Sequence, residues 1–407
     1  MKKISIILLI TLFNLLPQIS FAQMRWESTS GPSTSPATCI MEAPNGDLYV
    51  GTFSKGIFKS TNNGDTWSEV NDGIAFLNIQ ALTSNVQGHV FAGSSGGGIY
   101  RSVDDGKTWS QINNGLTNLY IAALAVNKEG AVFCITGFSR VFRSTDNGET
   151  WTRVFYGGDL GMNCLYVAPN GFLLSGCNKG VYGSTDGGNT WYSYSTDDGY
   201  VPAMAFDSLG YVYIADPLRV WYASINVLYW NYLGYQQSIY SLAATPDGTL
   251  YAGHLNDGVY MISNHDKESW QLVNDNLSDT HVHCLLLKSD GILYAGTLSG
   301  TVFRSTKSVT GIQSGRDQVP QSFELYQNYP NPFNPSTTIT YSIPFESEVM
   351  LRVFNVLGEE VKSLVHKNTL PGIYSVTFNA SGLSSGIYMY ELSSETFKIR
   401  KKMMLLR

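Results

Sequence analysis

The chain has 407 residues, of which only 14% are charged and 13% aromatic, with 40 glycines and 25 tyrosines. This composition excludes disorder and long charged helices, and it favours a β-rich chain with many turns. The formal net charge of −6 argues against a nucleic-acid partner, because phosphate binding requires a basic surface.

Residues 1–22 have the pattern of a secretory signal peptide. Lys2 and Lys3 precede an apolar run that ends at Leu16, and Ser20-Phe21-Ala22 places small residues at a cleavage site. The run is shorter than the roughly 20 residues that span a bilayer, and no later segment is apolar and long enough to do so. We therefore expect cleavage after Ala22 and no transmembrane segment in the mature chain.

A glycine-led apolar segment recurs seven times between residues 46 and 296. The copies are Gly46–Gly51, Gly88–Gly93, Gly130–Ile135, Gly171–Gly176, Gly210–Ala215, Gly248–Gly253 and Gly291–Gly296. Each copy leads to an aromatic strand that ends in serine, and these serines are 39 to 42 residues apart. Such a period holds four short strands, which is one propeller blade. The sequence therefore predicts a seven-bladed β-propeller over residues 23–310.

The tryptophans of the repeat are offset by one blade. A tryptophan follows the serine in every repeat except the last, and Trp26 precedes the first complete repeat. We expect Arg25-Trp26-Glu27 to supply the outer strand of the seventh blade, so that the two ends of the propeller close the ring and leave no exposed sheet edge.

Four turns between the third and fourth strands share the pattern S-x-D/N-x-G-x-T-W. Its positions are Ser60, Asn62, Gly64 and Trp67; Ser102, Asp104, Gly106 and Trp109; Ser144, Asp146, Gly148 and Trp151; and Ser184, Asp186, Gly188 and Trp191. The Asp or Asn can accept hydrogen bonds from its own turn, the glycine can supply a positive φ, and the indole can fill space between blades. An acid repeated around a ring cannot converge on one substrate, so we expect a structural role.

This turn pattern resembles the Asp-box, or bacterial neuraminidase repeat. Asp-box propellers include sialidases, xyloglucanase-like glycosidases and photosystem assembly factors of the Ycf48 type. A sialidase resemblance would require three arginines on the substrate carboxylate, but the predicted inner strands contain none. Arg101, Arg143 and Arg304 instead share one repeat position just before the serine, which indicates a scaffold role.

Glycoside hydrolysis would require two carboxylates about 5 to 10 Å apart. The candidates in loops expected on one face are Asp159, Asp197, Asp198, Asp216, Asp257, Asp275 and Asp279. Nothing in the sequence pairs two of them, and each is more simply a solvated turn residue. His281 and His283 lie two apart on a strand, with His254 as a further candidate, but no complete set of metal ligands is evident. We expect no catalytic residue, no metal and no cofactor.

The same loops carry aromatic side chains that suit a sugar or peptide ligand, because rings provide large contact area at low entropic cost. The candidate ligand face consists of Phe76, Tyr120, Tyr156, Asp159, Tyr200, Tyr235, His254 and His281. The favoured hypothesis is a noncatalytic glycan- or protein-binding or adhesion module. The alternatives are a polysaccharide-acting glycoside hydrolase and a purely structural surface protein.

The five cysteines, Cys39, Cys134, Cys164, Cys177 and Cys284, cannot all pair. Only Cys164 and Cys177 flank one hairpin turn, at Pro169-Asn170-Gly171. A two-residue turn would place them opposite each other, whereas a type I turn with a bulge would shift the register by one residue. Both alternatives are open from the sequence.

The repeats stop after Ser305, and a polar linker over 311–324 leads to a second domain over 325–407. The proline-rich stretch Tyr329–Thr337 prevents helix at its start. Four short strands follow, at 338–343, 349–356, 372–378 and 386–392, which predicts a small Ig-like β-sandwich.

This second domain resembles the type A sorting domain of the type IX secretion system. The resemblance rests on YPNPFNPST at 329–337, Val353–Val361, Pro371–Val376, Leu383–Tyr388 and the basic tail Lys398–Arg407. It implies a Bacteroidota-type cell, export to the periplasm by the leader, recognition by the secretion machinery, and release or attachment at the outer cell surface. The alternative is a fibronectin-like stalk domain.

Overall fold

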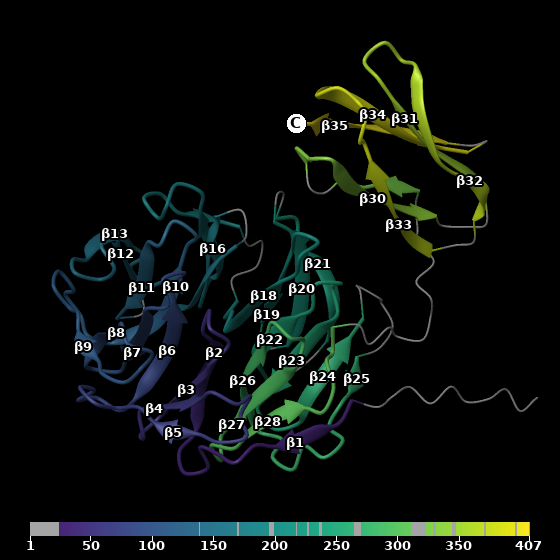
Figure 1. Cartoon of the computed structure of the whole chain (residues 1–407). Coiled ribbons are helices and arrows are strands. Elements are labelled where there is room, and N and C mark those ends of the chain that lie inside the picture. Colours follow the sequence, from purple (N-terminus) through teal and green to yellow (C-terminus); the bar gives the residue numbers. More distant parts are fainter. Residues whose placement is uncertain are drawn as a thin grey trace, which may run out of the picture. The chain divides into compact units, whose positions relative to one another are not determined.

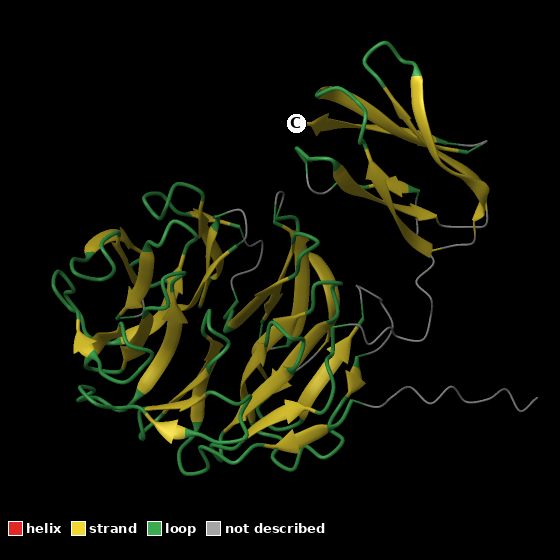
Figure 2. Ribbon diagram, in the orientation of Figure 1, coloured by secondary structure: helices red, strands yellow, loops and turns green. Residues whose placement is uncertain are grey.

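The computed structural model describes residues 24–310 and 323–406 with short internal gaps, at 138, 169–170, 195–198, 217, 226–227, 236–237, 264–269, 329–330, 344–346, 370–371 and 395–396. Figure 2 shows strands and loops and no helix in this part of the chain. The predicted all-β class is therefore confirmed. Within these residues, no helix has the length and apolar character needed to cross a membrane. The predicted signal peptide and residues 311–322 of the predicted linker lie outside the described residues.

The chain divides into two compact units, Ala22–Ile312 and a unit that contains Gln313–Arg407. In the first unit, the described residues form seven four-stranded antiparallel sheets, which we call sectors 1 to 7 (Figure 1). The innermost strand of each sector lies beside that of the next, and β26 of sector 7 lies beside β2 of sector 1. The sectors therefore form a closed ring.

The strands of sectors 1 to 4 follow one another in chain order. Sector 1 contains β2 (Ala37–Glu42), β3 (Leu48–Thr52), β4 (Ile57–Ser60) and β5 (Ser68–Glu69); sector 2 contains β6 (Ile79–Ser84), β7 (Val90–Ser94), β8 (Gly98–Ser102) and β9 (Ser110–Gln111). Sector 3 contains β10 (Ile121–Val126), β11 (Val132–Thr136), β12 (Arg140–Ser144) and β13 (Thr152–Tyr156); sector 4 contains β14 (Met162–Val167), β15 (Leu173–Cys177), β16 (Gly180–Ser184) and β17 (Tyr192–Ser193).

Sectors 5 to 7 complete the ring. Sector 5 contains β18 (Ala203–Phe206), β19 (Tyr211–Ala215), β20 (Arg219–Ser224) and β21 (Asn231–Tyr235); sector 6 contains β22 (Ile239–Ala244), β23 (Leu250–His254), β24 (Gly258–Ile262) and β25 (Gln271–Leu272). Sector 7 contains β26 (Val282–Leu287), β27 (Leu293–Thr297), β28 (Val302–Ser305) and, as its outermost strand, β1 (Trp26–Ser28).

Strand β1 joins the start of this unit to its end. It pairs antiparallel with β28, so that Trp26 lies opposite Ser305 and Glu27 opposite Arg304. The Trp26 side chain is fully buried. Its Nε1 donates to the carbonyl oxygen of Val273 in sector 6 at 2.6 Å.

Trp109 and Trp151 make the same kind of contact between sectors. Trp109 Nε1 donates to Val70 O at 2.8 Å, and Trp151 Nε1 donates to Ile112 O at 2.7 Å. In each case the acceptor lies three residues after the tryptophan of the preceding sector. Val273 has the same relation to Trp270, so Trp26 occupies the tryptophan position of sector 7.

The core lies between the sectors. Every residue of the second strands β3, β7, β11, β15, β23 and β27 is buried. Strands that are covered on both faces need apolar or small residues at successive positions. This requirement explains the continuous runs such as LYVGT and VFCIT.

The register of sector 4 settles the geometry at Cys164 and Cys177. Cys164 lies opposite Gly176, and Cys177 lies opposite Met162, because the register shifts between Met162 and Cys164. The structure contains no bond between the two sulfurs. Burial raises the pKa of the Cys164 thiol to about 12, so this thiol is held in its unreactive protonated form.

The second unit has two antiparallel sheets. One contains β29 (Glu324–Leu325), β30 (Ser336–Ile343) and β33 (Gly372–Asn379); the other contains β32 (Glu360–Thr369), β31 (Ser347–Phe354), β34 (Gly386–Ser393) and β35 (Lys398–Leu405). Residues from both sheets, including Ile339, Leu351 and Tyr390, share one buried core. The two sheets therefore pack against each other. Tyr329 and Pro330 of the proline-rich stretch lie outside the described residues.

Candidate functional site

The three turns with the S-x-D-x-G-x-T-W pattern share one set of internal hydrogen bonds, and the turn at Asn62 differs only in that the Asn62 amide donates to the Thr66 hydroxyl. In the second turn, Ser102 Oγ donates to Asp104 Oδ1 at 2.7 Å and accepts from Gly106 N at 2.8 Å. Thr108 donates to the same carboxylate from its backbone nitrogen at 2.9 Å and from its hydroxyl at 2.7 Å. The turns at Ser144 and Ser184 repeat these contacts. Each carboxylate is thus occupied within its own turn.

These hydrogen bonds favour the ionised carboxylate. Backbone and side-chain bonds from Thr108, followed by the bond from Ser102, lower the pKa of Asp104 to about 2. Equivalent bonds lower the pKa of Asp146 and of Asp186 to about 2. Such groups are poor proton donors near neutral pH, so their environment does not suit general acid catalysis.

The turn backbone explains two residue choices. Gly106 has a φ of 82°, and the preceding Asp105 has a φ of 59°. Two successive residues therefore adopt the left-handed conformation, which glycine tolerates best and Asn or Asp next best. Asn63, Asn147 and Gly187 occupy the position of Asp105 in the other three turns.

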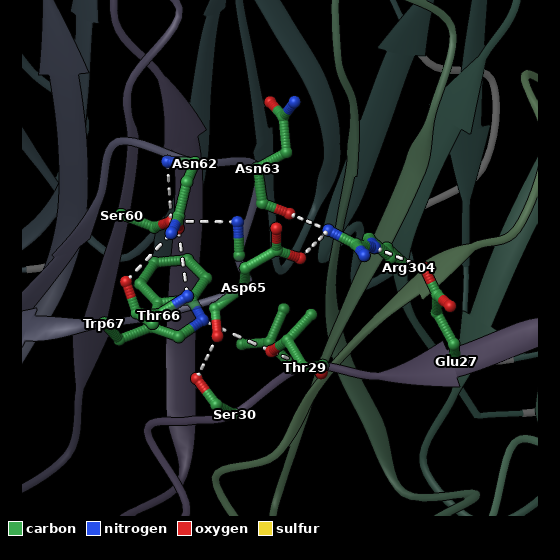
Figure 3. A network of polar contacts seen from close by, with 12 residues as sticks. Glu27, Thr29, Ser30, Ser60, Asn62, Asn63, Asp65, Thr66, Trp67 and Arg304 are labelled. Carbon is green, nitrogen blue, oxygen red and sulfur yellow. Dashed lines mark hydrogen bonds and ion pairs between the residues drawn. The ribbon is translucent and has the colours of Figure 1, made fainter.

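In sectors 2, 3 and 7, the arginine before the serine reaches the next sector. Arg101 Nη1 donates to Asn147 O at 2.7 Å, and Arg143 Nη1 donates to Gly187 O at 2.9 Å. Figure 3 shows the corresponding contact at the junction of sectors 7 and 1, where Arg304 Nη1 donates to Asn63 O at 2.6 Å. Arg304 also pairs with Glu27 of β1 and with Asp65. These arginines are therefore committed to contacts between sectors.

The opposite face of the ring carries most of the exposed aromatic side chains. We call it the connection face, because it is formed by the connections that lead into the innermost strands and by the turns between second and third strands. The two sets are joined by backbone bonds, such as Gly56 N to Leu77 O and Gly98 N to Leu119 O, both 2.9 Å. Its exposed aromatic residues are Phe53, Phe76, Tyr120, Tyr156, Tyr200 and Tyr240.

Four of the predicted face residues, Phe76, Tyr120, Tyr156 and Tyr200, are thus exposed on the connection face, and Asp159 is exposed in the connection after Tyr156. Two of these tyrosines, Tyr120 and Tyr200, occupy equivalent positions in their repeats. Tyr120 and Tyr200 each immediately precede the first buried residue of an inner segment, Ile121 and Val201, and His281 has the same place before Val282. Tyr156 stacks under the Arg140 guanidinium, 5.2 Å from its ring centre.

His254 is not part of this exposed set. It ends the buried strand β23, is 1% exposed, and packs against the Tyr260 ring at a centroid distance of 4.6 Å. Neither ring nitrogen has a hydrogen-bond partner in the described part of the chain. Burial, opposed only by the charge of Asp257, lowers the pKa of His254 to about 4. For Tyr235, the side chain lies outside what the structure describes.

Three of the candidate carboxylates, Asp216, Asp275 and Asp279, have other partners among the described residues. Asp197 and Asp198 lie outside the described residues. Asp216 is buried and accepts from the backbone of Leu218 and Arg219, from Arg219 Nε at 2.9 Å and from Trp221 Nε1 at 3.0 Å. These contacts give it a role within its turn.

Two further acids of sectors 6 and 7 also have partners. Asp275 forms an ion pair with Arg25, at 3.9 Å. Asp279 accepts from Ser299 N at 3.2 Å and lies 3.1 Å from His281 Nδ1. Burial acts to raise the pKa of Asp279, but hydrogen bonds from Ser299, His281 and Thr297 lower it to about 2. Among the described residues, no group of three or more His, Cys, Asp or Glu side chains is arranged to hold a metal ion.

The sequence reasoning missed one set of residues on this face. Six of the seven innermost strands have a bulge at the same place, where the register skips one residue. The skipped residues, which we call the bulge residues, are Thr38, Gln80, Ala122, Asn163, Tyr240 and His283. The only available signal was alignment of the seven inner segments, in which they share one column.

Two family models match separate parts of the chain. Residues 327–406 match the secretion system C-terminal sorting domain, and residues 22–162 match the DUF6242 beta propeller domain. The chain thus carries a sorting domain behind a β-propeller, as predicted. No curated protein shows significant sequence similarity to it.

Solved structures share this fold at low sequence identity. PorZ, a bacterial surface component of the type IX secretion system of Porphyromonas gingivalis, is 16% identical with a TM-score of 0.55; the match covers 93% of this chain and 60% of PorZ. YCF48 bound to a D1 peptide is 15% identical with a TM-score of 0.59, over 69% of this chain and 97% of YCF48. Virginiamycin B lyase from Staphylococcus aureus is 10% identical with a TM-score of 0.58, over 70% and 99%. At these identities the likeness establishes the fold alone.

Proposed function

We propose that the mature chain is a secreted, surface-located seven-bladed Asp-box propeller that binds an extracellular glycan or protein through its connection face, without catalysis. Its domains are a signal peptide over 1–22, the propeller over 23–310 closed by its N-terminal strand, a linker over 311–324 and an Ig-like sorting domain over 325–407. The sorting domain supports delivery by the type IX secretion machinery.

One contrast between the two faces supports binding at the connection face. The exposed aromatics of the connection face, among them Tyr120, Tyr156 and Tyr200, present ring surface to solvent. On the opposite face, by contrast, the carboxylates of the repeated turns are engaged within the turns. Tyrosine rings that combine apolar area with a polar hydroxyl are favoured at recognition surfaces. The first face is therefore suited to a ligand and the second to holding the ring together.

Binding of the mature chain, residues 23–407, to glycan and peptide arrays tests this proposal. We expect a saturable ligand whose binding falls at least tenfold in the Tyr120→Ala, Tyr156→Ala double variant if that ligand contacts these sectors. Tyr229→Ala is the matched control, because Tyr229 is 74% exposed in a turn of the opposite face. Absence of any ligand on either array would contradict the binding function.

The surface address is tested separately. We expect a chain without residues 322–407 to accumulate in the periplasm of a cell with a type IX system, and the full chain to reach the surface. Protease accessibility on intact cells distinguishes the two locations. Surface delivery of the truncated chain would contradict the assigned role of the sorting domain.

A further inference from the structure

The bulge residues provide a second, more specific feature of the connection face. A β-bulge turns one side chain away from the regular alternation of the strand, and bulges are over-represented beside binding sites. Here the bulge recurs at the start of six innermost strands, so the six side chains form one tier around the ring. Four of them, Thr38, Gln80, Asn163 and Tyr240, carry uncharged polar groups, and none is Lys, Arg, Asp or Glu.

Two aromatic bulge residues, Tyr240 and His283, lie in sectors 6 and 7, and a third aromatic residue, Tyr200, lies beside the innermost strand of sector 5. The Tyr240 and His283 rings lie 5.7 Å apart between centroids, with an interplanar angle of 34°. Tyr200 leads into β18, the innermost strand that lies beside β22, and Tyr240 lies at the start of β22. Tyr200 is 41% exposed and Tyr240 39% exposed, so both present ring surface to solvent.

The third ring of the cluster is uncharged at neutral pH. Burial lowers the pKa of His283 in spite of hydrogen bonds with the backbone of Thr38 and Ala37, which act to raise it. On this face of sector 7, Asp279 Oδ1 lies 3.1 Å from His281 Nδ1, so these two side chains are partners of each other. The three residues of the cluster therefore offer ring surfaces and phenol hydroxyls to a ligand, and none of the three carries a charge at neutral pH.

This chemistry distinguishes between ligand classes. An anionic ligand would need guanidinium or ammonium partners, and the tier has none. A neutral sugar ring has an apolar C–H face that can pack on an aromatic ring and hydroxyls that can bond to phenol groups. Building on the binding function proposed above, we propose that Tyr200, Tyr240 and His283 form a platform that binds a neutral glycan, with a sugar ring packed on Tyr240.

The test is titration of the mature chain with neutral oligosaccharides, namely cello-, malto- and manno-oligosaccharides, with oligogalacturonates as anionic probes. We expect saturable binding of at least one neutral series. Tyr240→Ala should weaken it about tenfold or more, as for a central aromatic contact, whereas Tyr240→Phe should retain binding within about threefold. Tyr229→Ala is again the control, and melting curves of all variants establish that they are folded.

Each outcome separates this inference from the proposed function. Neutral oligosaccharide binding that persists in Tyr240→Ala and Tyr200→Ala would overturn the platform and leave a binding face elsewhere. If the chain binds only oligogalacturonates or only peptides, the proposal that its ligand is a neutral glycan is wrong. Failure of the wild-type chain to bind any probe on the glycan and peptide arrays would overturn both proposals.

Discussion

Sectors 1 to 4 and sectors 5 and 6 belong to one ring but satisfy their polar groups in different ways. In sectors 1 to 4 the third turn closes through one serine, one Asp or Asn and one threonine, and each time the glycine nitrogen donates to the serine Oγ. Sector 5 instead relies on a buried pair in which Tyr213 donates to Asp207 at 2.7 Å. Sector 6 contains four buried polar atoms without a partner in the described part of the chain, on Ser241, His254 and Trp270, which is as many as sectors 2 and 3 contain together.

The difference shows where the repeat is free to change. A closed ring needs every sector to pack against its neighbours, but it does not need every turn to be closed by the same side chains. Departures from local rules tend to coincide with functional sites. In this chain the less regular sectors 5 and 6 also contribute Tyr200 and Tyr240 to the proposed platform.

The largest effect is expected at the closure of the ring. Deletion of residues 23–30 removes β1 and the fully buried Trp26, and loss of such an indole alone costs about 3 to 5 kcal/mol. We expect the melting temperature to fall by about 10 °C and the exposed edge of β28 to promote self-association. Calorimetry and analytical ultracentrifugation measure the two effects.

Trp26→Ala is the matched control for this deletion. It removes the indole but retains the strand, so stability should fall without self-association. An unchanged melting temperature and a monomeric state in the deletion variant would show that β1 does not seal the ring.

The next effect is a loss of stability in mild acid caused by His254. Its pKa is about 4 in the folded chain, below the value of about 6.5 expected in the unfolded chain. The unfolded state therefore binds the proton first as the pH falls. The full stability is present above about pH 6.5 and decreases by about 3 kcal/mol as the pH falls to about 4. Urea midpoints measured between pH 4 and 8 report this change.

His254→Thr should flatten that dependence. Thr52, Thr136 and Thr297 occupy the same place at the end of the second strand in other sectors, and Thr52 Oγ1 donates to Gly56 O at 2.9 Å. Any slope that remains in this variant belongs to other groups, such as His283, whose pKa burial also lowers. Equal pH dependence in both proteins would rule out His254 as the cause.

A smaller loss of stability is expected when an indole is replaced, and its size should differ between a regular and a less regular sector. Trp109 Nε1 bonds to Val70 O, whereas Trp270 Nε1 has no partner in the residues that the structure describes. Trp109→Phe should therefore cost about 1 to 2 kcal/mol, since it leaves a buried carbonyl unpaired. Trp270→Phe should cost less than Trp109→Phe by about 1 kcal/mol. Equal losses in chemical denaturation would show that the two sectors do not differ in this way.

The sequence predicted the parts of the fold that repeat. The seven glycine-led segments, the serines and the turn residues recur because each sector must bury the same strands, so one chain contains many observations of one unit. The exposure of Tyr120 and Tyr156 could be predicted for a similar reason, because connections lie at the surface.

The features that were missed occur once or depend on register. His254 replaces a hydroxyl residue at a buried position, and nothing in its local sequence indicates that it faces inward. The bulge residues depend on a register shift between strands, which hydrophobic pattern alone does not reveal. Tyr240 therefore appeared as an ordinary strand residue.

The smallest effect is expected at the carboxylate of a regular turn. Asn62 in the first turn accepts from Ser60 Oγ and from Thr66 N, and its Nδ2 donates to Thr66 Oγ1 at 3.0 Å. Asp104→Asn should reproduce these contacts in the second turn and change stability by no more than about 0.5 kcal/mol at pH 7. Asp104→Ala removes the acceptor and should cost about 1 kcal/mol, as for a lost turn or helix cap.

The pH dependence of stability in wild type and in Asp104→Asn shows the contribution of the Asp104 charge. Because the pKa of Asp104 is lowered to about 2, its ionised form contributes stability above about pH 4 that is lost as the pH falls toward 2. Asp104→Asn should lack this contribution, so its stability relative to wild type should rise in acid. A large loss at pH 7 in Asp104→Asn would show that the turn requires the charge and not only the hydrogen-bond geometry.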